Sequence, residues 1–540
     1  MALTPEELDD LVDRYTRERA DAHGIKRWWR GQQLRQLAKA TTISADHAAV
    51  DGLTRRGVSG LGGGRVLPAR TPGIIIEGST RQMPGLWPWT IGGDSPIIGA
   101  PLGHHLIHQR PVHFDQLDWF NAGLITAPVT IIIATNGSGK STLAARLMTY
   151  AIATGRCPIA AADIKPDHAE RIERFGGQII RMNRDIINPL APGAMGRAAL
   201  LLSGDKQETL RADMLQSQLL NMKTLIRLQR GNQPIGDVEG AILDEAIRHL
   251  NSNPTQAADF APELKHLDEL LETPTAEMMH KAVARSVDEY HAAAHRLIGS
   301  VRAMVSPSSL FGRMFSGQTT HPLDTDSTGI DIDVSRVPEG DKDARGAAIA
   351  LGWTESYAAV TAAHALSDAG KARARVFDLY LEELWQVLGA GDIVLDILNR
   401  ESRTNRTKGT TITSMTHSVS DFAGSVDASQ ADTAQAIFEK CQVRFYGRVG
   451  RKERLRLADY ENFTDAEISM FTSWGRAHGL HSSDQGAQRR QAPGLGHFIM
   501  KLSEDDGAGI PFKVHVPESQ RRLHNTSARL SAVRRDTATV

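Results

Sequence analysis

The sequence is poor in the features that mark disulfide-bonded, zinc-stabilised or membrane-spanning proteins. Only two of its 540 residues are cysteines, Cys157 and Cys441, which excludes a disulfide framework and a four-cysteine zinc site. Its longest apolar stretches, such as residues 123–129 and 131–134, are far too short to span a bilayer. The opening residues, MALTPEELDDLVDRY, are acidic and helix-like, unlike a targeting segment. These absences predict a cytoplasmic protein that reaches the inner face of a membrane only through partners.

The chain also lacks an excess of charge of either sign. It contains 62 Lys and Arg residues against 63 Asp and Glu residues, for a formal net charge of −1. The total charge therefore gives no electrostatic argument for nucleic-acid binding, although a local basic patch is compatible with it. Hydrophobic residues make up 41% and charged residues 23%, close to the average of globular proteins, so wholesale disorder is excluded.

The pattern of strands and helices divides the chain into three blocks and two tails. Residues 1–105 form a short N-terminal region with a Gly-rich linker, GVSGLGGGR. Over residues 106–195, short apolar strands alternate with helices, which is the order of a parallel α/β sheet. Residues 196–324 show helical periodicity and predict an all-helical insertion. The α/β pattern returns over residues 325–520, and residues 521–540 form a polar tail.

Two local patterns in the second α/β block predict helices. A long helix is expected from about residue 342 to 366. Near the end of the block, Thr464 and Glu467 form a capping box, and Phe463 and Ile468 are spaced as a hydrophobic staple.

The clearest chemical signal is ATNGSGKST, residues 134–142, between the apolar strand VTIII and the helix LAARLMTYAIA. Small residues let backbone amides curl around a β-phosphate, and the helix N-terminus adds a favourable dipole. Lys140 places its charge on the β- and γ-phosphate oxygens, and the Ser141 hydroxyl binds Mg²⁺. The motif usually opens with Gly, but Ala134 is small enough for that position. We predict that ATP is bound by Asn136, Gly137, Ser138, Gly139, Lys140, Ser141 and Thr142.

A phosphate-binding loop needs a second strand that ends in acids beside the Mg²⁺. RVFDLYLEELW supplies an apolar run followed by Glu382 and Glu383. We predict that Glu382 holds the metal and its water shell, and that Glu383 polarises the attacking water as a general base. Asp378, four residues upstream, is expected to sit in the middle of the strand. The alternative is that the two acids form an ordinary solvated helix start.

The order of these motifs resembles that of a known family. After the phosphate loop come ADIKPDHAERIERFGGQII, INPL, a long helical segment, EELW and an Arg-rich segment, RTNRTKGTTITSMTHSVSDF. This order resembles the VirB-four class of conjugative-transfer ATPases, the cytoplasmic motors of type IV secretion within the HerA–FtsK clade. Residues that match the family's motifs are Asp163, Lys165, Asp167, Gly176, Gly177, Asn188, Pro189 and Trp385, with GLGHFIM and VHVPES resembling its closing strand pair.

The resemblance covers roughly residues 85–520 and implies a RecA-like P-loop NTPase core with an all-helical insertion. It also implies a hexameric ring, membrane-associated secretion-channel partners and a DNA or DNA–protein substrate. In that family the next core strand usually ends in a Gln that senses the γ-phosphate, and the corresponding residue here is His417. A histidine can hydrogen-bond a phosphate or a water, but it can equally be an ordinary strand-end residue.

Arginines near two core strands are further candidates. Arg403 and Arg406 lie in a basic run before the strand that carries His417, and in ring-shaped NTPases an arginine reaches into the neighbouring subunit's site. The alternative is a solvated or nucleic-acid-facing helix end. A further group in or just after QVRFYGRV could face a pore substrate or only water: Arg448, Arg451, Lys452 and Arg454.

Taken together, the residues predict an α/β ATPase with Lys140, Glu383, His417, Arg403 and Arg406 as catalytic candidates, and with Ser141 and Glu382 at the metal. The function we predict is a MgATP-hydrolysing motor that energises substrate transfer or assembly in a conjugative or type IV secretion-like system. One alternative is a DNA translocase of the same clade, which requires a basic lining on one face of the ring. A second is an assembly protein that hydrolyses slowly and uses ATP as a structural switch.

Overall fold

The computed structural model describes residues 95–252, 261–382, 409–418, 438–458, 460–475, 494–503, 507–518 and 520, together with a few positions before residue 60. The chain divides into two compact units, Met1–Glu77 and Gly78–Val540. In the first unit, strand β1 (Leu53–Thr54) pairs antiparallel with β2 (Gly57–Val58). All further elements belong to the second unit. Within the described residues, no helix is both long and apolar enough to cross a membrane.

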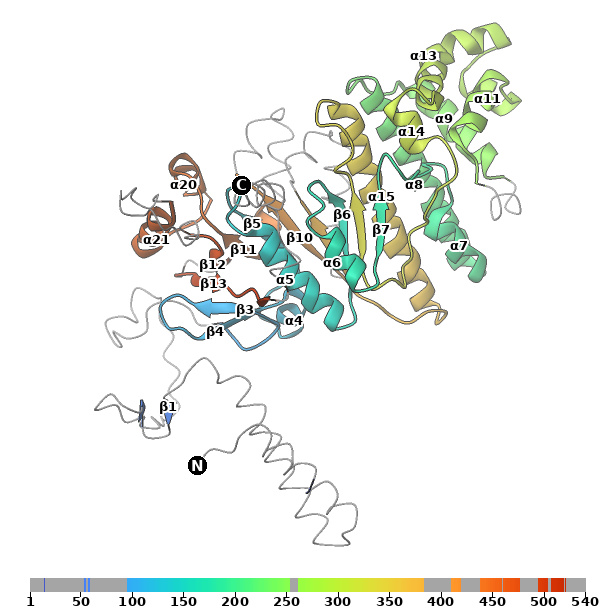
Figure 1. Ribbon diagram of the computed structural model, residues 1–540. Coiled ribbons are helices and arrows are strands. Elements are labelled where there is room, and N and C mark those ends of the chain that lie inside the picture. The colour runs from blue at the N-terminus through green and yellow to red at the C-terminus, as the bar shows by residue number, and fades with distance from the viewer. Residues whose placement is uncertain are drawn as a thin grey trace, which may run out of the picture. The chain divides into compact units, whose positions relative to one another are not determined.

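The second unit is built on a sheet of eleven strands (Figure 1). In chain order these are β3 (Ala100–His105), β4 (Pro111–Phe114), β5 (Val129–Ile133), β6 (Cys157–Asp163), β7 (Gln178–Arg181), β8 (Ile330–Asp333), β9 (Phe377–Leu381), β10 (Thr410–Thr416), β11 (Val443–Tyr446), β12 (His497–Leu502) and β13 (Ile510–Val514). Their order in the sheet is β4-β3-β13-β12-β11-β5-β10-β9-β6-β8-β7. The seven strands from β11 to β7 run parallel, and the other four pair antiparallel. This sheet confirms the predicted α/β class.

The central strands are buried because both faces of the parallel sheet are covered. Every residue of β5 and β6 is buried. Ile131 and Ile133 pack into the core beneath the inserted helices, whereas Ile132 packs on the opposite face with Leu143 and Leu147. The last two residues belong to α5 (Lys140–Ala153), the helix that follows the phosphate loop. The loop is thus held between a fully buried strand and a half-buried helix.

Between β7 and β8 in the chain, the described residues contain helices and no strand. These helices are α7 (Gly193–Leu201), α8 (Asp205–Gln229), α9 (Asp237–Leu250), α11 (Leu264–Glu272), α12 (Ala276–Lys281), α13 (Val287–Val305) and α14 (Leu310–Phe315) (Figure 1). The long helix α15 (Lys342–Asp368) packs against α7, α8 and β6, and so joins these helices to the sheet. Gly352 permits this packing, since a Cβ there would lie 2.6 Å from the Ala161 carbonyl oxygen of β6.

Strand β3 precedes residue 106, where we expect the first α/β block to begin, yet it pairs with β4 and β13 in the main sheet. The other short helices are α4 (Gln116–Asn121), α6 (Ala169–Arg174), α20 (Arg451–Leu457) and α21 (Asp465–Gly475). At the start of α21 the predicted capping box is confirmed. The Thr464 amide donates to Glu467 at 2.7 Å, and the Glu467 amide donates back to Thr464 Oγ1 at 3.3 Å. Phe463 packs against Phe471, whereas Ile468, its predicted partner in the hydrophobic staple, is exposed.

Asp378 lies within β9, as its second residue, and belongs to a buried polar network. Arg156 donates to Asp115 at 2.6 Å and lies 3.3 Å from the Asp378 carboxylate. Thr411 Oγ1 donates to Asp378 at 2.7 Å from the neighbouring strand. Through these contacts the Asp378 carboxylate links β9 to β10 and, by way of Arg156, to the start of β6 and to α4. The network lies away from the carboxyl ends of the strands.

Candidate functional site

The phosphate-loop sequence forms a tight turn between β5 and α5. Gly137 and Gly139 adopt φ values of 69° and 104°, which residues with a Cβ rarely adopt. Gly139 caps α5 without any side-chain cap, so the first amides of the helix keep their donor capacity for an anion. The space around Gly137 is open, since a Cβ on this residue would have no neighbouring atom within 4 Å.

Hydrogen bonds from neighbouring segments hold this loop in place. The Thr135 amide donates to the Arg448 carbonyl at 2.8 Å, and the Ser138 carbonyl accepts from the Gly496 amide at 2.9 Å. Ala134, which stands where the motif usually has Gly, is fully buried against the residue after β11. That residue is Gly447, where a Cβ would lie only 2.6 Å from the Ala134 methyl group. A glycine on the adjacent strand therefore accommodates the alanine.

Lys140 and His417 meet at the carboxyl edge of the sheet. Lys140 Nζ donates to the Ala134 carbonyl at 2.7 Å and lies 2.6 Å from His417 Nδ1. An ammonium group only donates, so His417 Nδ1 accepts in this contact. The structure thus places the predicted sensor residue directly beside the predicted phosphate-binding lysine.

The turn after β6 reaches the phosphate loop from the neighbouring side. Lys165 Nζ lies 3.5 Å from Asn136 Oδ1. A hydrogen bond joins Ser141 to the carboxylate of Asp167, whose pKa is raised because it is largely buried. Asp163, at the end of β6, stabilises the turn by accepting from the Lys165 amide at 3.2 Å and from the His168 amide at 2.9 Å.

Glu382, the predicted metal-binding acid, is buried and contacts His168, which was not among the predicted site residues. His168 Nε2 and Glu382 Oε1 are 2.7 Å apart, and the histidine is fully buried. Burial alone lowers the pKa of His168, but the charge of Glu382 and its hydrogen bond outweigh this effect and raise the pKa to about 9. Glu382 therefore favours the protonated form of His168.

Two further acids line this edge. Burial, followed by the charge of Glu382, raises the pKa of Asp163 to about 6. Asp331 on β8 is fully buried, and burial together with the nearby Asp163 carboxylate raises its pKa well above the usual range. Carboxylates packed this closely disfavour one another's ionised forms.

The Arg448 side chain is directed toward the phosphate loop and is hydrogen-bonded to it. Its Nε donates to Thr135 Oγ1 at 3.3 Å, and a terminal nitrogen donates to the Asn136 carbonyl at 3.3 Å. The sequence signal was its place directly after β11, the strand next to β5 in the sheet. Chain separation concealed the contact, since more than 300 residues lie between the partners.

Of the predicted site residues, the structure brings together the phosphate loop from Asn136 to Thr142, His417 and the acid-bearing end of β9 at Glu382. Glu383, Trp385, Arg403 and Arg406 lie outside the described residues, as does most of the predicted Gly-rich linker. The roles of these residues stay predictions.

The donor set fits a nucleotide with Mg²⁺. The uncapped helix start, the left-handed glycines and Lys140 supply donors and positive charge for a polyphosphate. Ser141, Asp167 and Glu382 supply the hydroxyl and carboxylate oxygens that Mg²⁺ prefers.

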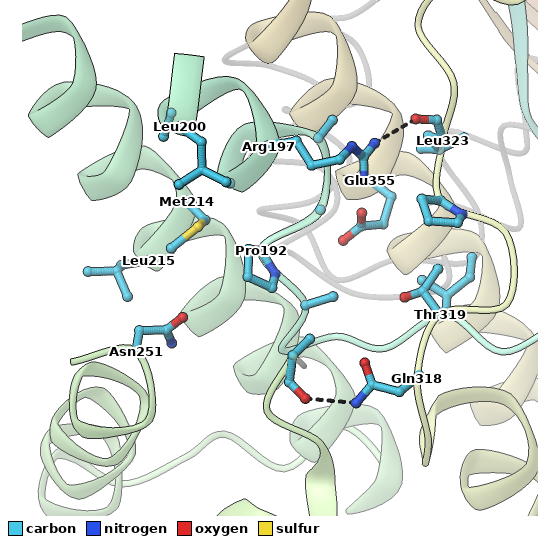
Figure 2. A pocket seen from close by; sticks show the side chains of 18 of the residues that line it. Pro192, Arg197, Leu200, Met214, Leu215, Asn251, Gln318, Thr319, Leu323 and Glu355 are labelled. Carbon is cyan, nitrogen blue, oxygen red and sulfur yellow. Dashed lines mark hydrogen bonds between the residues drawn. The ribbon is translucent and has the colours of Figure 1, made fainter. Parts of the chain in front are cut away.

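A cavity of about 500 Å³ lies elsewhere, among α7, α8, α15 and residues 318–323 (Figure 2). Figure 2 shows Glu355 of α15 in its wall, near Arg197, which donates to the Leu323 carbonyl at 2.9 Å. Asn221 Nδ2 lies 3.4 Å from the Glu355 carboxylate, and burial raises the pKa of Glu355 to about 7. No residue of the phosphate loop lines this cavity, so it is separate from the candidate nucleotide site.

The strand order defines a RecA-like α/β core, with the loop of residues 134–142 at the carboxyl edge of its parallel strands. No protein-family model and no curated protein matches the sequence. Among solved structures, VirB4 of Thermoanaerobacter pseudethanolicus matches 80% of this chain and 100% of its own chain, with a TM-score of 0.57 and 17% sequence identity. The bacterial conjugative coupling protein TrwB matches 72% of this chain and 86% of its own, with a TM-score of 0.42 and 13% identity. The VirB4 match confirms the resemblance to the VirB-four class as a shared fold.

Proposed function

We propose that the protein is a MgATP-hydrolysing motor that energises substrate transfer or assembly in a conjugative or type IV secretion-like system. The observation that carries the proposal is the position of Lys140. It starts α5 after a buried parallel strand. It lies beside His417, which follows β10, and next to Ser141, which is hydrogen-bonded to Asp167. Phosphate-binding loops of NTPases combine these groups in this way.

Each residue has a defined part in the proposed reaction. The loop amides and Lys140 bind and orient the β- and γ-phosphates, and the charge of Lys140 stabilises the transition state. Ser141 and Glu382 would hold Mg²⁺, which would supply positive charge to the phosphate oxygens. Glu383 accepts a proton from the attacking water, and His417 hydrogen-bonds the γ-phosphate or that water.

The motor role rests on the fold shared with VirB4 and on the family's motif order. By the same resemblance we propose a hexameric ring that works in the cytoplasm against membrane-associated channel components. A DNA or DNA–protein substrate is part of the proposal, and Arg403 or Arg406 supplies the arginine finger between subunits.

A slow nucleotide switch is the second candidate, and one contact favours it. Lys140 is already bonded to Ala134 and His417, so a phosphate has to displace these partners before the lysine can assist hydrolysis. Such an exchange suits a protein that changes conformation on binding ATP and hydrolyses it slowly.

The deciding experiment measures ATP turnover by the full chain with Mg²⁺, with and without DNA. For Lys140→Ala we expect no turnover above background and an unchanged melting temperature, because the side chain lies at a loop and supplies charge to the phosphates rather than to the core. Lys140→Arg serves as the control that keeps the charge but not the geometry, and we expect it to bind nucleotide without efficient turnover. Undiminished turnover by folded Lys140→Ala would remove the assignment. Turnover near one event per minute, unaffected by DNA, would select the switch.

A further inference from the structure

His168 occupies a place that the proposed reaction does not use. It is fully buried, its Nε2 lies 2.7 Å from Glu382 Oε1, and its Nδ1 has no partner among the described residues. Its backbone is fixed on both sides. The amide donates to Asp163 at 2.9 Å, and the carbonyl accepts from the Ile172 amide of α6 at 3.0 Å. The imidazole therefore has little freedom to move away from Glu382.

The residue before His168 contacts the other predicted ligand of the metal ion. Asp167 is hydrogen-bonded to Ser141, the predicted Mg²⁺ ligand of the phosphate loop. Two consecutive residues of one turn thus hold Ser141 and Glu382. The turn itself is anchored to the sheet, because the Asp163 carbonyl accepts from the Val334 amide at 3.0 Å.

We propose that His168 is the positioning residue of Glu382, which it holds through Nε2 so that the carboxylate and Ser141 keep a fixed relation across the turn after β6. The inference rests on the proposed function, because it assumes that Glu382 serves Mg²⁺. Partners that orient metal-binding carboxylates typically contribute 10–100-fold to metal affinity. A purely structural ion pair would instead affect stability alone.

The geometry supplies a matched pair of variants. In His168→Gln, the amide nitrogen can take the place of Nε2 and still donate to Glu382, whereas in His168→Asn the shorter side chain can only replace Nδ1, which has no partner here. Both changes are polar and uncharged. They therefore remove the same ionic interaction and differ in whether the hydrogen bond to Glu382 can form.

The assay follows fluorescence of methylanthraniloyl-ADP bound to the full chain, first in EDTA and then during titration with Mg²⁺. We expect equal nucleotide affinity in EDTA for the wild type and both variants. The Mg²⁺ concentration at the midpoint should rise about tenfold for His168→Asn and less than about threefold for His168→Gln. A wild-type midpoint for His168→Asn, or equal shifts for both variants, would overturn the inference. Absence of nucleotide binding by the wild type would instead overturn the proposed function.

A double variant tests whether His168 acts through Glu382. In a Glu382→Gln background we expect His168→Asn to cause no further change of the Mg²⁺ midpoint, because the group it positions is already altered. An additional shift of tenfold would show an independent role and contradict the inference. This background also removes the buried carboxylate that His168→Asn leaves without its partner, so it provides the result if the single variant melts below the assay temperature.

Discussion

The ammonium group of Lys140 is hydrogen-bonded to the Ala134 carbonyl and to His417 Nδ1 in the structure. Both are acceptors, and a phosphate oxygen is a stronger one because it carries negative charge. If Lys140 binds a phosphate as proposed, binding exchanges these partners. His417 would then release the lysine, and its ring could hydrogen-bond the phosphate in the proposed reaction.

The two acids after β9 should have separable effects. For Glu383→Gln we expect MgATP binding to persist while kcat falls by about two to four orders of magnitude, since only the acceptor of the water's proton is lost. Glu382→Gln should mainly raise the Mg²⁺ concentration needed for half-maximal turnover. Steady-state rates across a Mg²⁺ series distinguish the two. Exchanged phenotypes would mean that the acids have exchanged roles on this strand.

Glu355, in the wall of the cavity, should make stability depend on pH. Its pKa is raised from 4.5 to about 7, first by burial, with Asn221 and Arg197 acting in the opposite direction. A raised carboxyl pKa means that ionisation disfavours the folded state. The penalty is fully present above pH 7, declines as the pH falls, and is absent below the unfolded pKa of 4.5.

We therefore expect Glu355→Gln to increase the free energy of unfolding by about 2 kcal/mol at pH 8 and to change it little near pH 4.5. Urea denaturation at these two pH values and at pH 6 measures the difference. A variant that is less stable than the wild type at pH 8 would show that the Glu355 carboxylate has a cationic partner in solution.

At the scale of elements, the parallel strands bring the site together. β5, β6, β9 and β10 are neighbours in the sheet, so the loops at their carboxyl ends meet although they are far apart in the chain. The phosphate loop, the turn after β6, Glu382 and His417 each come from one of these ends. Residues within the strands, such as Asp378, are buried and serve the sheet.

The Asp378 network should matter for stability and not for chemistry. Asp378→Asn leaves Arg156 with one carboxylate in a buried site, and we expect a loss of about 2–4 kcal/mol in the free energy of unfolding with kcat retained. Asp244→Asn is the control, because its pair with Arg248 on α9 is exposed and should contribute less than about 0.5 kcal/mol. Chemical denaturation and turnover of the two variants test this. Loss of turnover in a folded Asp378→Asn protein would place this carboxylate at the reaction.

The strands and the phosphate loop could be predicted because their signals are local. Five buried residues in succession, four of them apolar, followed by small residues, Lys140 and Ser141, need no knowledge of distant parts of the chain. The contact of His168 with Glu382 spans 214 positions, and that of Arg448 with Asn136 spans 312. No periodicity or spacing encodes such contacts, since they arise only when the order of strands in the sheet is known.

At the scale of the whole molecule, α15 connects the inserted helices to the strands that carry the site. It packs on α7 and α8 along its length, and on β6, whose carboxyl end forms the turn with Asp167 and His168. A displacement of the inserted helices can therefore reach the site through one rigid helix.

The last prediction is that the active site is shared between subunits. If Arg403 or Arg406 acts as a finger in the neighbouring subunit, specific activity should rise with protein concentration, because an arginine supplied from a neighbour is worth about 10³–10⁵ in rate in other NTPases. Mixing Arg403→Ala or Arg406→Ala protein with Lys140→Ala protein should restore part of the turnover. A mixed interface can pair an intact phosphate loop on one subunit with an intact arginine on the next.

Turnover measured across a dilution series, with light scattering to follow assembly, tests the idea. Flat specific activity from a protein that stays monomeric would exclude a shared site, and full activity of both arginine variants would assign these residues to solvent or substrate.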